Sequence, residues 1–177
     1  MTRKVLFLDF DGVLNDNAWF ETEERKNLER EYRRRDKALP PTESEITMKL
    51  GLADIRPQYA ARVREIVDRT GCEVIVCSAW RYTFTAEQIW YLLQSQGIPC
   101  NGVVQQTRRR KLSDLLDYRV PDIKAVVSTF AGKTNWCVLD DSVNASEVDG
   151  RAVTPVDGVT RDNVEEVVRI LNNTDTE

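Results

Sequence analysis

The sequence predicts an α/β fold, a three-layer sandwich of helices around a parallel sheet of five strands. Two observations carry this prediction. Short apolar runs of strand-forming residues recur along the chain, and patterns of helical period lie between them. Strands that alternate with helices pair in parallel and are covered on both faces. The expected strands are Val5–Asp9, Glu73–Cys77, Val103–Gln105, Trp136–Asp140 and Ala152–Val156.

The length of the chain limits how many domains it forms. Its 177 residues, of which 41% are hydrophobic, suffice for one core and one domain. We therefore expect a single domain over residues 1–177, with a small helical insertion over residues 17–54 after the first strand.

The first strand leads directly into two carboxylates. Asp9 and Asp11 are separated by one residue, and Gly12 lets the chain turn sharply after them. Neighbouring carboxylates at the edge of a core repel each other unless a cation or a proton lies between them. The pattern predicts a divalent metal with one carboxylate free to act as a nucleophile. In a phosphoryl-transfer site, Asp9 would attack phosphorus, and Asp11 would protonate the leaving oxygen and later activate water. An aspartate-rich turn without chemistry is the alternative.

The predicted insertion interrupts the alternation of strands and helices. Charges of both signs crowd residues 21–37, and their acid–base pairs at i,i+4 spacing favour a helix. Pro40-Pro41 ends this helix, and residues 42–52 show no clear pattern. Two interpretations stay open, a lid over the carboxylates and a solvated helix without a role at that site.

The later segments between strands have the period of amphipathic helices, and a glycine follows the first two. The expected helices are Pro57–Thr70, Ala86–Gln96, Asp122–Phe130 and Arg161–Leu171. Trp90 falls on the apolar face of the second of these, so we expect it in the core. Together with Trp80 and Tyr91 it is also a candidate for stacking on bases.

Polar residues follow the second and fourth strands as they follow the first. Ligands of parallel sheets bind beyond the carboxyl ends of the strands, so we expect Ser78 and Asp140 beside Asp9. Asp140 and Asp141 offer the oxygen ligands that Mg²⁺ prefers. An Asp-Asp pair also opens turns, and Ser78 is equally the expected N-cap of the next helix, so both interpretations stay open.

Several cations are candidates for binding phosphate. Arg81 follows Ser78 closely and is suited to hold a substrate anion bidentately. Arg119 and Lys124 flank the start of the helix after Pro121, and either is placed to neutralise the nucleophile and the phosphoryl group. A charge on the helix surface is the alternative for each.

A run of consecutive cations, Arg108, Arg109, Arg110 and Lys111, follows the third strand. Such a run binds the phosphates of a nucleotide or a polynucleotide, and a solvated loop is the alternative. The formal net charge of −4 argues against non-specific binding of nucleic acid over the whole protein surface, so any surface that binds anions is local.

The composition excludes several classes of function. The chain has no histidine, which removes serine–histidine and cysteine–histidine mechanisms and most zinc sites. Its 4 cysteines lack metal-binding spacing, and Cys77 and Cys137 lie in apolar runs, as in reduced cytoplasmic proteins. The apolar run near the N-terminus is too short for a signal peptide, and nothing approaches a membrane span. We therefore expect a cytoplasmic protein without membrane contact.

These motifs resemble those of the haloacid dehalogenase (HAD) superfamily of phosphotransferases. Asp9-x-Asp11-Gly12 is similar to its first motif, Ser78 to its second and Asp140-Asp141 to its fourth, with Arg119 or Lys124 as the basic third motif. The resemblance covers the chain except the insertion. It implies a Rossmann-like sheet, an aspartyl-phosphate intermediate, and Mg²⁺ held by the Asp9 carboxylate, the Asp11 carbonyl and Asp140 or Asp141.

A narrower resemblance concerns the second motif. Residues 70–81 are similar to this motif in HAD domains associated with RNA repair, which are related in kind to polynucleotide 3′-phosphatases. Residues 119–123 and 157–160 extend the resemblance. It implies a Mg²⁺-dependent phosphatase that acts on a phosphorylated nucleotide or nucleic-acid end. A small-metabolite phosphatase and a non-catalytic binding module on the same scaffold are the alternatives.

Overall fold

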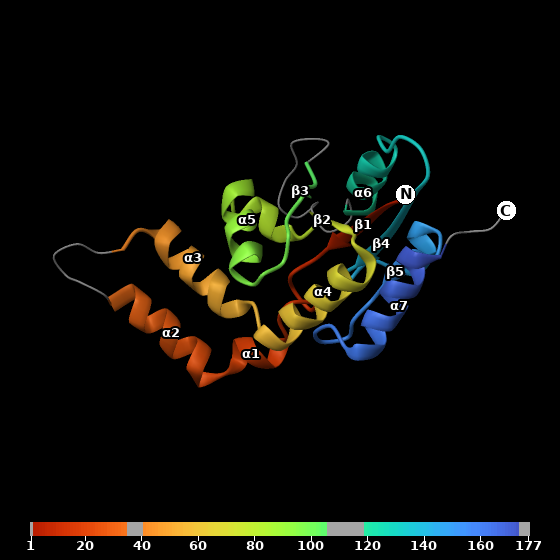
Figure 1. Cartoon of the computed structure of the whole chain (residues 1–177). Coiled ribbons are helices and arrows are strands. Elements are labelled where there is room, and N and C mark those ends of the chain that lie inside the picture. The colour runs from red at the N-terminus through yellow and green to blue at the C-terminus, as the bar shows by residue number, and fades with distance from the viewer. Residues whose placement is uncertain (1, 35–40, 106–118, 174–177) are drawn as a thin grey trace.

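The computed structural model describes residues 2–34, 41–105 and 119–173. Its centre is a five-stranded sheet in which every pairing is parallel and the strand order is β3-β2-β1-β4-β5 (Figure 1). The strands are β1 Arg3–Leu8, β2 Glu73–Val76, β3 Gly102–Val103, β4 Thr134–Leu139 and β5 Ala152–Val153. The predicted α/β class and parallel sheet are confirmed.

The two edge strands are shorter than the sequence predicts. The expected strands 103–105 and 152–156 were wrong at their C-terminal ends, because β3 and β5 each pair on one side only and for two residues. Pro155 follows β5 closely, and a proline has no N–H to donate to a ladder. The central strands β1 and β4 pair over six residues and provide the rigid frame on which the site is built.

Successive residues of β1 belong to two separate cores, because side chains alternate between the faces of a strand. Leu6 and Leu8 pack in a core with α4 Pro57–Thr70, α5 Ala86–Ser95 and α7 Arg161–Asn172. Val5 and Phe7 pack in the second core with Ile123 of α6 Arg119–Val127. Helices on both faces make the three-layer sandwich that the sequence predicts.

Helix boundaries follow local chemistry. Helix α4 begins at Pro57 and ends at Thr70, and its C-cap is Gly71, whose φ of 65° is left-handed, as the sequence predicts. Helix α6 begins at Arg119, three residues before the expected start at Asp122. Pro121 then lies in the first turn of α6, where backbone N–H groups have no carbonyl partner within the helix, so a residue without an N–H is tolerated. This earlier start places Arg119 on the helix.

The insertion consists of α1 Asn17–Glu21, α2 Glu23–Arg34 and α3 Glu43–Asp54, which lie to one side of the sheet (Figure 1). Helix α3 is a feature that the sequence analysis missed. Its signal was present, because Thr42 and Glu45 form a capping box at its start. The expectation for Trp90 was also wrong. This side chain is 52% exposed, since the apolar face of α5 is centred on Ile89 and Leu92 instead.

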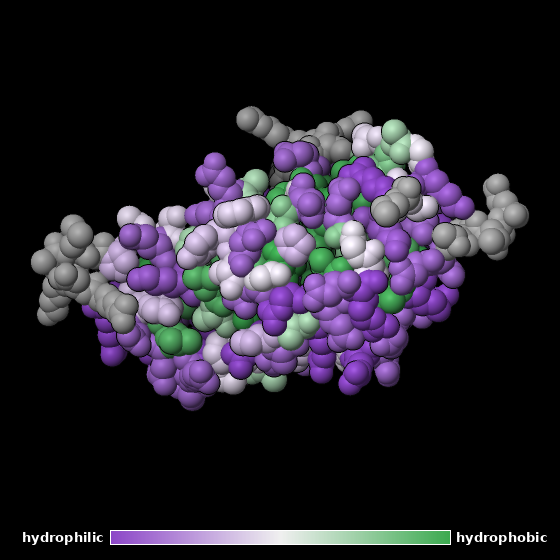
Figure 2. All heavy atoms as spheres, in the orientation of Figure 1, coloured by the Kyte–Doolittle hydropathy of each residue, from purple (hydrophilic) through white to green (hydrophobic). Residues whose placement is uncertain are grey.

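Figure 2 shows a face that is mostly hydrophilic, with apolar residues visible over its middle. Among the described residues, the helices lack the combination of length and apolar character that crossing a membrane requires.

Candidate active site

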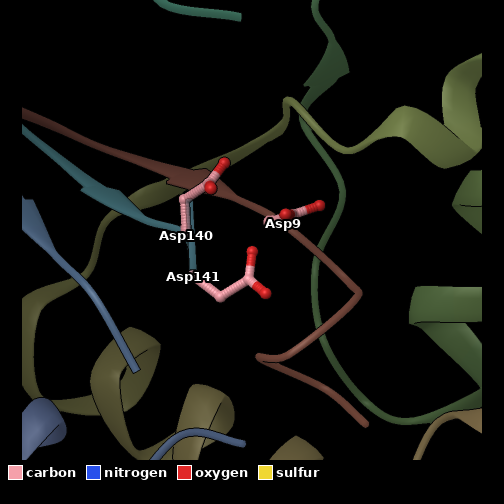
Figure 3. A group of neighbouring side chains, drawn as sticks. All are labelled: Asp9, Asp140 and Asp141. Carbon is pink, nitrogen blue, oxygen red and sulfur yellow. The ribbon is translucent and has the colours of Figure 1, made fainter. Parts of the chain in front are cut away.

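Three carboxylates lie together where the central strands end. The register that pairs Leu8 with Leu139 brings Asp9 beside Asp140, and the Asp9 N–H donates to the Leu139 carbonyl at 3.0 Å. Oxygens of Asp9, Asp140 and Asp141 all lie within 4.8 Å of one another (Figure 3). Asp9 and Asp140 are buried, whereas Asp141 is exposed. The sequence prediction that these acids meet is therefore confirmed.

Arg119 is the cation that joins the two buried acids. Its Nη1 donates to Asp9 Oδ2, to Asp140 Oδ2 at 2.5 Å and to Ser142 Oγ at 3.1 Å. The guanidinium therefore offsets repulsion between two carboxylates that have little contact with water. Lys124, the other candidate from the sequence, is exposed on α6, and among the described residues only Arg119 of these two cations bonds the buried acids.

Asp140 is held in place by its own loop. Its Oδ1 accepts from the Ser142 N–H at 2.9 Å, the Ser142 hydroxyl at 2.8 Å and the Val143 N–H at 3.1 Å. The sequence analysis missed Ser142. An Asp followed two residues later by Ser is a turn signal that points to such bonds. With Arg119 on its other oxygen, Asp140 is a fixed negative charge beside Asp9.

The environment of Asp9 favours its protonated form. Burial and the charge of Asp140 raise the pKa of Asp9 to about 7, against the opposing effects of Arg119, a hydrogen bond from Ser78 and the Phe10 N–H. Ser78 is itself buried at the end of β2 and also accepts from the Trp80 N–H at 3.2 Å. Ser78 therefore caps the turn after β2 and lies beside Asp9, and its contact with a phosphoryl group stays a prediction.

Asp11 lies apart from the buried acids and is exposed. The indole Nε1 of Trp80 donates to both of its carboxylate oxygens at 3.0 Å, and Asn15 Nδ2 donates to Oδ1 at 2.9 Å. The indole is stacked on Phe10 at 4.6 Å and tilted against Phe84 at 5.2 Å between ring centroids. Packing against Phe10 and Phe84 therefore holds the Trp80 indole in place, and the indole N–H in turn holds the Asp11 carboxylate. This arrangement makes Trp80 a contact of the site rather than a free stacking surface.

The residues at this site fit a magnesium ion. All the side-chain donors are carboxylate oxygens, which Mg²⁺ prefers. Gly12 has a φ of 67°, and a Cβ added there would lie 2.4 Å from Asp141 Oδ2. Because Gly12 has no side chain, the Asp141 carboxylate can pack directly against the turn that carries Asp11.

The structure gives Arg81 several protein partners. Its guanidinium pairs with Asp122 at 3.2 Å and donates to the carbonyls of Cys77 and Ser78 and to the Tyr82 hydroxyl. Its side chain is 4% exposed. These bonds tie the turn after β2 to α6, so Arg81 joins the segments that carry Ser78 and Arg119. Its binding of substrate stays a prediction. Arg108, Arg109 and Arg110 lie outside the described residues.

A cleft of about 260 Å³ separates the insertion from the turn after β2. Phe20, Arg25 and Leu50 line it from the insertion, and Trp80 and Phe84 line it from the opposite side, with Asp11 between them. The insertion therefore faces Asp11 across this cleft. Such a position fits the lid interpretation better than that of a helix remote from the site, and lid motion stays a prediction.

A model of one protein family matches residues 5–169, and its description is HAD domain in Swiss Army Knife RNA repair proteins. The match spans the described sheet, the acids and the insertion. Neither curated proteins nor solved structures return a match.

Proposed function

The chain belongs to the family of HAD domains in Swiss Army Knife RNA repair proteins, and on this premise we propose that it is a Mg²⁺-dependent phosphomonoester hydrolase acting through Asp9. Membership of the family supports HAD-type phosphatase chemistry in general. The observation that carries the proposal is the buried pair of Asp9 and Asp140 bridged by Arg119. Buried like charges are costly, so their clustering at strand ends indicates a site for chemistry.

In the first step, an Asp9 oxygen attacks the phosphorus of a phosphomonoester. The new bond joins this oxygen to phosphorus, the bond from phosphorus to the leaving oxygen breaks, and Asp11 gives that oxygen a proton. Ser78 and Arg119 contact Asp9 and are placed to stabilise the negative charge of the transferring group. The result is an aspartyl phosphate on Asp9 and a free alcohol.

In the second step, Asp11 accepts a proton from water, whose oxygen attacks the phosphorus. The bond between phosphorus and Asp9 breaks, which releases inorganic phosphate and restores the carboxylate. Trp80 and Asn15 hold the Asp11 carboxylate at the edge of the site, which supports assigning both proton transfers to it. One side chain thus serves as acid and then as base.

Asp9, Asp141 and the backbone carbonyl of Asp11 would hold Mg²⁺, with Asp140 beside them. The bound ion supplies positive charge that offsets the repulsion between carboxylate and phosphate. Ionised Asp9 is the nucleophile, and its raised pKa means that a cation must compete with a proton for this carboxylate.

The proposed substrate is a nucleotide or the 3′-phosphorylated end of a polynucleotide. The RNA-repair description of the family supports this choice. Cations at positions 108–111 of the sequence are candidates for contacting further phosphates. A substrate with several phosphates makes turnover strongly dependent on salt, because each contacted phosphate releases counterions.

The test is release of phosphate, with Mg²⁺, from a 3′-phosphorylated oligonucleotide, from 3′- and 5′-mononucleotides and from sugar phosphates. Asp9→Asn is the variant, and Asp68→Asn, an exposed acid on α4, is the matched control. We expect release from the oligonucleotide end that Asp9→Asn abolishes and Asp68→Asn preserves, with trapped phosphoprotein in the wild type only. Full activity in Asp9→Asn contradicts the mechanism. Preference for sugar phosphates identifies a metabolite phosphatase, and no release from any substrate identifies a binding module.

A further inference from the structure

Asn15 is a buried polar residue in the turn that carries Asp11, and its side chain makes two different hydrogen bonds. It is 1% exposed. Its Oδ1 accepts from the Gly12 N–H at 2.9 Å, and its Nδ2 donates to Asp11 Oδ1 at 2.9 Å. A backbone N–H can only donate, so the bond to Gly12 sets the amide with its oxygen toward the backbone and its nitrogen toward Asp11. One side chain therefore contacts both the backbone and the carboxylate of the same turn.

The bond to Gly12 fixes the direction of the Asp11 carbonyl. This carbonyl and the Gly12 N–H belong to one planar trans peptide unit, so they point in opposite directions. Because the N–H points at Asn15 Oδ1, the Asp11 carbonyl oxygen points away from Asn15. Rotation of this peptide unit would break the bond and turn the oxygen elsewhere. The side chain of Asn15 thus acts on an atom that it does not touch.

The neighbouring carbonyls of the turn already accept hydrogen bonds. Backbone N–H groups donate to the carbonyls of Phe10, Gly12, Val13 and Leu14. Within the described parts of the chain, no backbone N–H donates to the carbonyl of Asp11. Its lone pairs are therefore available to a cation, and backbone carbonyls are among the oxygen ligands of divalent ions.

The bond to the carboxylate makes the two oxygens of Asp11 unequal. Oδ1 accepts from both Asn15 Nδ2 and Trp80 Nε1, whereas Oδ2 accepts from Trp80 alone among the described residues. A neutral carboxyl group has one oxygen that carries the proton and one that only accepts. The Asn15 amide offers a donor to Oδ1, so it selects Oδ2 as the oxygen that carries the proton. This bond is compatible with Asp11 as an acid and as a base.

We propose that Asn15 is a positioning residue that serves both roles of Asp11. Its Oδ1 holds the Asp11 carbonyl in the orientation that binds the metal, and its Nδ2 leaves Asp11 Oδ2 as the oxygen that exchanges the proton. The inference rests on the proposed function, because it assigns Asn15 a part in that metal site and that proton transfer.

Two variants separate the two halves of the amide. Asn15→Asp keeps an oxygen for the Gly12 N–H and replaces the donor to Asp11 by a second acceptor. Asn15→Leu has a similar size and removes both groups. Asn135→Leu is the matched control, because Asn135 is also buried and also donates from its amide, at the end of β4 opposite to the acids. Circular dichroism and thermal melting establish which variants fold.

Mg²⁺ binding without substrate is measured by titration calorimetry. We expect Asn15→Leu to weaken it about tenfold or more, the usual effect of losing a residue that orients a metal ligand. Asn15→Asp is expected to bind Mg²⁺ at least as well as the wild type, because the Gly12 N–H keeps its acceptor. Asn135→Leu is expected to bind Mg²⁺ as the wild type does.

Proton transfer is measured as the ratio of kcat for a 3′-mononucleotide to kcat for p-nitrophenyl phosphate, whose leaving oxygen needs no proton. We expect both Asn15 variants to lower this ratio about tenfold or more, because the donor that selects Oδ2 is lost in each. Asn135→Leu is expected to leave the ratio unchanged. If Asn15→Leu does not fold, this ratio in Asn15→Asp decides the test.

The inference is overturned if Asn15→Leu binds Mg²⁺ as the wild type does, if Asn15→Asp loses as much affinity as Asn15→Leu, or if neither variant changes the kcat ratio. These outcomes differ from failure of the proposed function. A wild type that releases no phosphate contradicts the phosphatase, while the expected difference in Mg²⁺ affinity between the two variants still supports the role of Asn15 at the carbonyl. Phosphate release by variants that match the wild type in both measurements contradicts the role of Asn15 alone.

Discussion

The indole N–H of Trp80 donates to both carboxylate oxygens of Asp11 at 3.0 Å, across 69 positions of the sequence. The ring is in turn packed on Phe10 and Phe84. A side chain that transfers protons must be held in one position, and this contact does so for Asp11. Trp80 therefore acts as a positioning residue in the proposed reaction.

Trp80→Phe removes this donor and keeps an aromatic ring in the stack. We expect kcat to fall about tenfold or more for alkyl phosphates, whose leaving oxygen needs a proton, and to fall much less for p-nitrophenyl phosphate. Steady-state kinetics on both substrates measures the difference. Trp90→Phe is the control, because that indole is half exposed on α5. An equal loss on both substrates would indicate a purely structural role.

Removing Arg119 leaves Asp9 and Asp140 buried without their shared cation. We expect Arg119→Met to lower the free energy of unfolding by about 3 kcal/mol in metal-free protein and to abolish activity, because an uncompensated buried charge is costly. Urea denaturation measures the first effect. Lys124→Met, on the exposed side of the same helix, is expected to change stability by less than about 0.5 kcal/mol. Equal effects of the two variants would contradict the assignment of Arg119.

The pKa of Asp9 makes the stability of the metal-free protein depend on pH. This pKa is about 7 in the folded protein and 3.8 in the reference state, so the folded protein holds the proton more tightly. The resulting stabilisation is complete below about pH 4 and is lost as the pH rises through about 7. As the pH rises from about 4 to about 7, we expect the melting temperature of the wild type to decrease relative to that of Asp9→Asn.

Thermal melts of the wild type and of Asp9→Asn across this range, without metal, measure the difference. Adding Mg²⁺ at the alkaline end is expected to raise the melting temperature of the wild type more than that of the variant, because the ion binds the ionised carboxylate. Parallel curves for the two proteins at every pH would show that Asp9 titrates as an ordinary aspartate.

Gly12 is expected to matter for the metal as well as for the backbone. Gly12→Ala puts a Cβ 2.4 Å from Asp141 Oδ2, whereas Gly71→Ala at a similar φ meets nothing within 4 Å. Both variants should lose about 1 kcal/mol of stability from the left-handed backbone. Only Gly12→Ala should weaken Mg²⁺ binding, as measured by titration calorimetry. Equal metal affinity in both variants would place Asp141 outside the metal site.

The sequence was a good guide to features that a clear local pattern marks. The capping and the ends of α4 follow from Pro57 and Gly71, and the acids at the ends of β1 and β4 follow from the apolar runs before them. Helix α3 was missed although its capping box is local, because no apolar period follows Thr42 clearly. The exposure of Trp90 was missed because apolar residues occupy more of α5 than the core covers.

The sequence by itself determined the parallel α/β class, the family resemblance and the set of acids, because strand period, helix period and short motifs are properties of neighbouring residues. Only the tertiary structure decided that Arg119 and not Lys124 joins Asp9, that Asp122 engages Arg81, and that Trp80 holds Asp11. Each of these depends on a contact between segments far apart in the chain. Such contacts are selected by packing of the whole core, which no local pattern encodes.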